Sequence, residues 1–163
     1  MSKHYMLDYH SPIGVIEIIS SEKSILSIMF VNRDLPVEHQ SELPEILRDC
    51  YKQLQQYFKG ERRVFTFPYE IRGTSFQQTV WNALVQIQYA ETASYRDIAN
   101  SLKKEKAVRA VGNANGKNTL SIVIPCHRII GTNGSLTGYA GGLWRKEWLL
   151  NHERKFKKMN YIL

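Results

Sequence analysis

The strongest constraint on the fold is a change in the hydrophobic pattern near residue 70. The first thirty residues are short apolar runs rich in β-branched residues, separated by "SPIG" and "SEKS", which is typical of strands joined by tight turns. After "TFPYEIRGTS", where Pro68 and Gly73 interrupt regular structure, apolar residues recur at helical spacing. We predict a two-domain α/β (α+β) protein: an N-terminal antiparallel sheet with one helix over 1–72, a helical domain over 73–157, and a tail over 158–163.

The helix of the N-terminal domain is predicted just before Gly60. "LPVEHQSELP" precedes it and is polar and bounded by proline, so it is interpreted as a linker. Cys50 lies on the apolar face of this helix, where a free cysteine behaves as a small hydrophobe. The apolar positions that predict the helix are Ile46, Leu47, Cys50, Tyr51, Leu54, Tyr57 and Phe58.

Four further helices are predicted beyond Gly73. "SFQQTVWNALVQIQ" is helical in pattern, with Ser75 available as its cap. "TASYRDIANSL" and "KAVRAVGNANG" are two short helices around the charged turn "KKEK", which indicates a helix-turn-helix, although any helical hairpin gives this pattern. In "WRKEWLLNHERKFKK" we expect Trp144, Trp148, Leu149 and His152 to share one face.

The positive charge of the chain is confined to its second half. The net charge is +7, yet residues 1–93 hold nine basic and eleven acidic residues, whereas residues 94–163 hold thirteen basic and four acidic ones. A field of that sign attracts nucleic acid first and anionic membranes second. Charge alone leaves a merely soluble basic surface equally open.

Composition limits the environment and the cofactors. The chain has no apolar run of membrane-spanning length and no N-terminal signal pattern, so we expect a cytoplasmic protein without membrane attachment. Two cysteines cannot form a disulfide framework. His4, His10 and His39 form no ligand cluster with Cys50, so no metal is predicted.

The segment "SIVIPCHRII" places a thiol beside an imidazole. A cysteine becomes a nucleophile as thiolate, which requires a base or positive charge nearby and an exposed position. His127 and Arg128 provide the base and the charge, and the glycine-rich stretch that follows is expected to leave Cys126 exposed. In a regular strand, however, neighbouring side chains face opposite sides, so the pair requires a backbone turn at Pro125 or a bridging water. The interpretation of Cys126 as an inert core cysteine also remains open.

A resemblance to a known protein family favours a reactive Cys126 over an inert one. "IPCHRII", "GSLTGYAGG" and "KEWLLNHE" resemble the O6-alkylguanine-DNA alkyltransferases, the methylated-DNA:protein-cysteine methyltransferases, and so do "NANGKN", "KAVRAVG", "SYRDIA" and "FQQTVW" upstream. With the weaker "QLQQYFKGERRVFTFP", the resemblance covers about residues 53–153. The first fifty residues are similar to the family's variable N-terminal domain only in general character.

The resemblance implies a role for five residues. Cys126 would accept the alkyl group from guanine O6, and His127 would remove the thiol proton through a water while Glu153 orients the imidazole. Tyr95 would donate its hydroxyl to the departing guanine, and Asn118 would position the Cys126 segment. From the residues alone, the favoured interpretation of Tyr95 is a core aromatic on a helix face, and Asn118 is interpreted as an ordinary turn residue.

The resemblance also implies how DNA is held. A stacked base is out of reach of the sulfur, so the enzyme would flip it, with Arg109 inserted in its place. The small residues near Arg109, Ala110 among them, would let this helix enter the minor groove. Further phosphate contacts are expected from Arg96, Lys104 and Thr132, and the wall of the base pocket from Tyr139, Ala140 and Gly141.

The implied activity is direct repair of DNA without a cofactor. A monomer would move the alkyl group from O6-alkylguanine in duplex DNA to Cys126 irreversibly, once per molecule, with O4-alkylthymine as a second candidate substrate. Gln88, Ala90 and Thr119 depart from the family's usual proline or glycine and put turn geometry in doubt.

Two other functions remain open from the sequence. One is a non-enzymatic helix-turn-helix binder of damaged DNA, or a regulator. The other is a cysteine hydrolase, which would need an oxyanion hole and multiple turnover.

Overall fold

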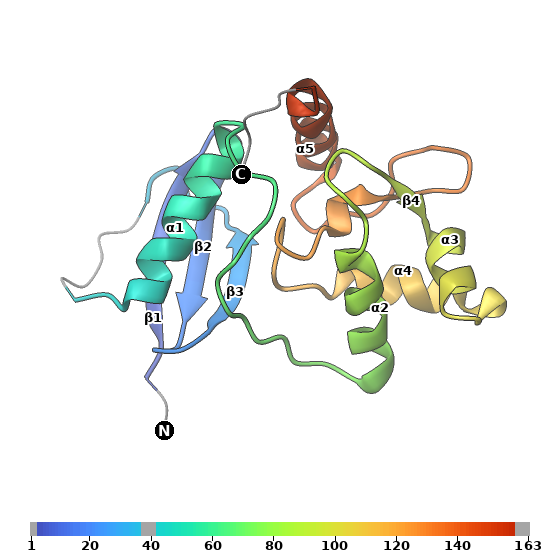
Figure 1. The fold of residues 1–163 in the computed structure, drawn as a ribbon, viewed down its shortest axis with the longest axis horizontal. Coiled ribbons are helices and arrows are strands. Elements are labelled where there is room, and N and C mark those ends of the chain that lie inside the picture. Colours follow the sequence, from blue (N-terminus) through green and yellow to red (C-terminus); the bar gives the residue numbers. More distant parts are fainter. Residues whose placement is uncertain (1–2, 37–41, 159–163) are drawn as a thin grey trace. The chain divides into compact units, whose positions relative to one another are not determined.

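The computed structural model describes residues 3–36 and 42–158. It divides the chain into two compact units, one that reaches to Ile71 and a second over Arg72–Lys158 (Figure 1). Part of the predicted linker, with His39, and residues 159–163 of the predicted tail lie outside the described residues. The predicted functional domain limits of 1–72 and 73–157 stay predictions.

The first unit is built on an antiparallel sheet in the order β1-β2-β3. Its strands are β1 (Tyr5–Ser11), β2 (Gly14–Ser20) and β3 (Ile25–Phe30). A tight turn joins β1 to β2, where Ser11 pairs with Gly14 and the Ser11 hydroxyl donates to the Gly14 carbonyl at 2.6 Å. The predicted meander is confirmed.

Helix α1 (Glu45–Phe58) packs against the sheet (Figure 1). Its buried positions include Leu47, Cys50, Leu54 and Tyr57, so the predicted apolar face is the one that contacts the core. Burial raises the pKa of Cys50, which keeps this sulfur a thiol at neutral pH. Cys50 is therefore a packing residue, as its position on the helix predicted.

The second unit is mainly helical. Its long helices are α2 (Ser75–Val85), α3 (Tyr95–Ser101), α4 (Val108–Gly116) and α5 (Leu143–Phe156). Two single turns of 3-10 helix, η1 (Glu105–Ala107) and η2 (Cys126–Arg128), lie between them. The short strands β4 (Ala93–Ser94) and β5 (Ile129–Ile130) pair in parallel.

Helix α2 starts one residue earlier than predicted. Thr74, and not Ser75, is the cap: its side chain accepts from the Gln77 backbone N–H at 3.1 Å, while the Gln77 side chain accepts from the Thr74 N–H at 3.0 Å. This reciprocal pair satisfies two N–H groups at once, which a cap at Ser75 would not achieve. Ser94 and Asp97 cap α3 in the same way.

A buried tryptophan joins α2 to α4. The Trp81 indole N–H donates to the Ala114 carbonyl at 2.8 Å, and the ring is 2% exposed. Helices α3 and α4, the predicted helix-turn-helix pair, pack against each other, with η1 between them in the chain. The bond fixes α4 against the core while its other side stays at the surface.

The prediction that Trp144 shares a face of α5 with Leu149 is wrong. Trp144 is 56% exposed, and the Arg145 guanidinium lies 4.5 Å from its ring centroid. The buried stripe of α5 runs through Lys146, Leu149, Leu150 and Glu153, at i, i+3, i+4 and i+7 spacing. Trp144 lies five residues before Leu149 and so projects from another side of the helix.

The departure at Ala90 is accommodated at a cost in backbone energy. Ala90 has φ of +64°, in the left-handed region that favours glycine. The turn forms all the same, since the Glu91 N–H donates to the Gln88 carbonyl at 2.9 Å.

No helix within the described ranges is long and apolar enough to cross a membrane.

Replacing Trp81 by phenylalanine should destabilise the second unit. The change removes the bond to Ala114 and leaves a gap, but the Ala114 carbonyl keeps a bond from the Lys117 N–H. We therefore expect a loss of about 1–2 kcal/mol in the free energy of unfolding, measured by urea titration. Trp144→Phe, at an exposed ring, should change it by less than about 0.5 kcal/mol. Equal losses in both variants would contradict the assigned role.

Ala90→Gly should stabilise the protein. Relief of the left-handed alanine, worth about 1–2 kcal/mol, outweighs the extra chain entropy of glycine, so we expect a gain of up to about 1 kcal/mol. Ala83→Gly, inside α2, makes the same chemical change at a helical position and should cost about 1 kcal/mol. Thermal unfolding of both variants checks the opposite signs; a loss in both would refute the strain at Ala90.

Candidate active site

The Cys126 segment is a series of turns and not a strand. The Ile124 N–H donates to the Leu120 carbonyl at 2.9 Å, and the Cys126 N–H donates to the Ile124 carbonyl at 2.7 Å. Ile122 has φ of +73°, rare for a β-branched residue. Only residues 129–130 of the predicted strand pair with another strand. The backbone therefore turns before Cys126. From the sequence, such a turn or a bridging water is required for the Cys126 thiol and the His127 imidazole to act together.

The Cys126 thiol is buried, so the expectation of an exposed sulfur is wrong. Cys126 is 6% exposed. Burial raises the pKa of Cys126, against a hydrogen bond from Asn118 and the positive charge of Lys146, which both lower it. The site thus holds opposing influences on the thiolate.

The buried side chain of Asn118 holds the Cys126 segment in place by hydrogen bonds. Its Nδ2 donates to Cys126 Sγ at 3.2 Å and to the Ile124 carbonyl at 2.9 Å, while its Oδ1 accepts from the Leu120 N–H at 2.9 Å. Asn118 is 3% exposed, whereas Thr119 points to the surface. One buried amide therefore fixes both the backbone turn and the sulfur, and the missing proline at Thr119 leaves these bonds intact.

His127 and Glu153 form a buried pair. His127 Nε2 lies 2.7 Å from Glu153 Oε2, and both side chains are 0% exposed. Burial lowers the pKa of His127, although Glu153 opposes this effect, so the imidazole is neutral at neutral pH. Because Nε2 must carry the proton that bonds to the carboxylate, Nδ1 keeps its lone pair. Nδ1 has no hydrogen-bond partner in the described part of the chain.

Arg128 is directed at Glu153 and not at Cys126, contrary to its expected place beside the thiol. Its Nε donates to Glu153 Oε1 at 2.8 Å, its Nη2 to Oε2 at 3.1 Å, and its Nη1 to the Ile87 carbonyl at 2.7 Å. The Ala90 N–H also donates to Glu153 Oε1, at 3.0 Å. Burial would raise the pKa of Glu153, but His127 and Arg128 hold it well below its usual range.

Tyr95 lies at the glycine-rich loop, which we define as residues 131–142. Its hydroxyl donates to the Thr137 carbonyl at 3.2 Å, and the same carbonyl accepts from Lys146 Nζ at 2.7 Å. A Cβ added at Gly112 of α4 would lie 3.6 Å from the Tyr95 ring. Tyr95 is therefore held between α4 and the loop, and it is not the core aromatic that the residues alone favoured.

Sequence reasoning missed Lys146. Burial lowers the pKa of Lys146 to about 8, against an opposing effect of Cys126. The signal was present in the sequence, because Lys146 shares the i, i+3 and i+7 spacing of the buried stripe of α5. A lysine in such a stripe requires a buried polar partner.

The three residues expected at the base pocket lie on the glycine-rich loop, where Tyr139 is partly exposed and Ala140 is exposed. Burial of its hydroxyl, and then the nearby Cys126, raises the pKa of Tyr139 well above its usual value. The Gly141 carbonyl accepts from Arg145 Nη1 at 2.8 Å, which fastens the end of the loop to α5. The loop therefore lies near the sulfur at Tyr139.

The residues expected to contact DNA all lie at the surface of the second unit. Arg109 and Ala110 are exposed on α4, and Arg96 is exposed in the first turn of α3. Lys104 Nζ lies 5.2 Å from the Phe76 ring centroid, and Thr132 is exposed on the glycine-rich loop. The structure thus leaves these five side chains accessible and gathers the reactive groups beneath the surface.

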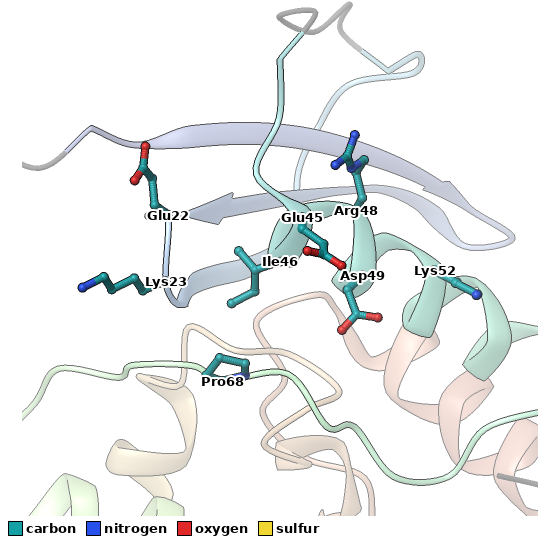
Figure 2. Close-up of a pocket in the computed structure, with 8 residues that line it drawn as sticks. All are labelled: Glu22, Lys23, Glu45, Ile46, Arg48, Asp49, Lys52 and Pro68. Atoms are coloured by element: carbon teal, nitrogen blue, oxygen red, sulfur yellow. The ribbon is translucent and has the colours of Figure 1, made fainter.

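A separate hollow of about 640 Å³ lies in the first unit (Figure 2). Side chains of both charge signs surround it, and it includes none of the predicted site residues. Its lining consists of Glu22, Lys23, Glu45, Ile46, Arg48, Asp49, Lys52 and Pro68.

Across the described ranges, no group of three or more His, Cys, Asp or Glu could hold a metal ion.

The buried histidine should make stability depend on pH. In the unfolded chain His127 binds a proton below about pH 6.5, whereas the folded protein, with a lowered pKa at His127, does not. The free energy of unfolding should therefore fall by up to about 1.4 kcal/mol per pH unit as the pH drops below 6.5. Urea titration of the wild type and of His127→Gln, which should lack this slope, checks the sign. His10→Gln, at the exposed end of β1, is the control, and an identical slope in all three proteins would contradict it.

Comparison with known proteins identifies the family. Residues 75–155 match the model for the 6-O-methylguanine DNA methyltransferase DNA binding domain, and residues 4–71 match that for its ribonuclease-like domain. The Methanosarcina acetivorans methylated-DNA–protein-cysteine methyltransferase is 43% identical over 152 residues, covering 91% of this chain and 97% of its own. The constitutive enzyme of Bacillus subtilis is 43% identical over 160 residues, covering 93% and 96%.

Solved structures agree with the sequence relatives. The O6-methylguanine methyltransferase of Mycobacterium tuberculosis superposes with a TM-score of 0.85 at 37% identity over 97% of both chains. The M. tuberculosis OGT in complex with DNA superposes with a TM-score of 0.82 at 40% identity, covering 91% of this chain and 92% of its own. The chain therefore belongs to the methylated-DNA–protein-cysteine methyltransferases, a family of DNA-binding repair proteins.

Proposed function

We propose that this protein repairs O6-alkylguanine in duplex DNA by transferring the alkyl group to its own Cys126. The observation that carries the proposal is the arrangement at the sulfur: Asn118 donates to Sγ at 3.2 Å, and the next residue, His127, is bonded to the buried Glu153 at 2.7 Å. A nucleophile beside a base that a carboxylate orients is the general pattern of activated nucleophiles. The family membership supports DNA as the substrate.

The proton of Cys126 leaves through His127. Nδ1 has the free lone pair, so a water bonded to Nδ1 would take the thiol proton and pass one to the imidazole. The imidazolium that forms is stabilised by Glu153, whose carboxylate stays ionised. His127 therefore acts toward Cys126 through a water and toward Glu153 directly.

The transfer is a displacement at the alkyl carbon. The sulfur forms a bond to this carbon as the bond to O6 breaks, and the electron pair of the broken bond stays on guanine. Guanine takes up the proton that the Tyr95 hydroxyl donates, so the leaving group departs neutral. The product is a thioether, which water does not cleave, and Cys50 lies buried in the other unit, so each molecule acts once.

Burial of the acceptor supports base flipping. With Cys126 only 6% exposed, a base stacked in a duplex is out of reach of Sγ and must leave the stack. We propose that Arg109 fills the space in the stack, that Ala110 allows α4 close approach in the minor groove, and that Tyr139, Ala140 and Gly141 line the pocket. Phosphate contacts are proposed for the exposed side chains of Arg96, Lys104 and Thr132.

The remaining proposals concern the domain that binds DNA, a second substrate, the oligomeric state and the location of the protein. Every proposed site residue lies within 73–157, so this domain binds DNA and accepts the alkyl group. O4-alkylthymine is proposed as a second substrate, since it carries the alkyl group on an equivalent exocyclic oxygen. We propose that the protein acts as a monomer in the cytoplasm, where both buried cysteines stay reduced.

Incubation with duplex DNA that contains O6-methylguanine should add one methyl group to the peptide that carries Cys126. Peptide mass spectrometry measures the modification. Cys126→Ala should abolish it, and Cys50→Ala, the matched control at the other cysteine, should retain it. An unmodified Cys126 peptide, or undiminished demethylation by Cys126→Ala, would contradict repair by transfer to Cys126. Demethylation with an unmodified Cys126 would indicate a hydrolase, and tight binding without demethylation would indicate a non-enzymatic binder.

A further inference from the structure

Lys146 is a buried cation on α5, the helix that packs against the turn η2 that holds Cys126. Its side chain is 0% exposed, in the stripe by which α5 contacts the core. Lysine is almost never fully buried unless its ammonium group has a partner, because desolvation of a charge is costly. Nζ donates to the Thr137 carbonyl at 2.7 Å, and a carbonyl is a neutral partner. The hydrogen bond alone does not account for the buried charge.

Among the described residues, no carboxylate forms an ion pair with this ammonium group. The ion pairs within the described part of the chain do not include Lys146. Glu153, on the same face of α5, already accepts bonds from His127 and Arg128. The negative charge that can face Lys146 is therefore the thiolate of Cys126.

Among the groups around Cys126, Lys146 is the fully buried cation that has no ion pair in the described part of the chain. These groups come from α5, from η2 and from the glycine-rich loop, and they are Lys146, Arg145, Glu153, His127, Arg128 and Tyr139. His127 is neutral, Arg128 is paired with Glu153, and the high pKa of Tyr139 keeps its hydroxyl protonated. Arg145 is bonded to the Gly141 carbonyl and stacks on Trp144.

We propose that Lys146 is a positioning residue for the alkyl transfer: its ammonium group stabilises the Cys126 thiolate and, through the Thr137 carbonyl, holds the glycine-rich loop against Tyr95. The proposal rests on Cys126 being the alkyl acceptor. The Thr137 carbonyl accepts from Lys146 at 2.7 Å and from the Tyr95 hydroxyl at 3.2 Å. One lysine thus connects the nucleophile with the group proposed to protonate the leaving base.

The coupling between the two groups is reciprocal. If Lys146 favours the thiolate, the thiolate must favour the ammonium form of Lys146 to the same extent. The directions of the two pKa shifts agree with this, since Lys146 lowers the pKa of Cys126 and Cys126 raises the pKa of Lys146. Alkylation ends the coupling, because a thioether carries no charge.

The first test is the pH profile of Cys126 toward a small thiol reagent. Iodoacetamide alkylation is followed by mass spectrometry on the peptide that carries Cys126, in the wild type and in Lys146→Met. Loss of the ammonium group should raise the midpoint by about one pH unit and slow the reaction at pH 7 about tenfold. Lys155→Met removes the same charge from an exposed position on α5 and should leave the profile unchanged. A folded Lys146→Met with the wild-type midpoint would overturn the proposal.

The second test needs no variant at Lys146 and no reagent that must reach the sulfur. NMR titration of the Lys146 side chain in the wild type and in Cys126→Ala should give a lower pKa in Cys126→Ala, by the same shift as the first test. An equal Lys146 pKa in both proteins would overturn the proposal. Neither test contains DNA, so a failure here is distinct from a failure of the wild type to take methyl from O6-methylguanine.

Discussion

The buried carboxylate of Glu153 is the interaction on which the rest of the site depends. It accepts from His127 Nε2 at 2.7 Å, from Arg128 Nε at 2.8 Å and from the Ala90 N–H at 3.0 Å. These bonds join α5 to η2 and to the turn after α2, three segments far apart in the sequence. Breaking a buried ion pair by removal of one partner costs about 3–5 kcal/mol. The carboxylate that orients the proposed base is therefore also a tertiary link of the second unit.

The site reconciles two opposing demands on the sulfur. Burial protects Cys126 from side reactions and raises its pKa, whereas a nucleophile must ionise. The structure meets the second demand with the hydrogen bond from Asn118, the charge of Lys146 and the free lone pair of His127. Under the proposed function the thiolate would form only as the proton leaves through His127, when a base already lies in the pocket.

Sequence patterns predicted what local periodicity determines. The strands of the first unit, the face of α1 that holds Cys50, and α2 to α5 follow from the alternation or helical recurrence of apolar residues. The residues of the site were found through a motif, and the structure places His127 beside Glu153 at hydrogen-bonding distance.

What the sequence could not supply depends on contacts between distant segments. The direction of Arg128 and the burial of Cys126 are set by the packing of α5, the turn after α2 and the glycine-rich loop, which no local period encodes. The exposure of Trp144 and the identity of the residue that caps α2 each depend on a shift of one or two positions along a helix, which the apolar pattern does not resolve. Left-handed Ala90 and Ile122 break residue preferences, and tertiary packing determines both.

The central claim is that Cys126 is consumed by the repair of one base. The most direct measurement is the number of guanine bases restored per protein molecule when O6-methylguanine duplex is supplied in increasing excess. The account predicts a plateau at one restored guanine per molecule, with no further repair on longer incubation. Repair that continues past one equivalent would show that Cys126 is regenerated or is not the acceptor, and would contradict the account.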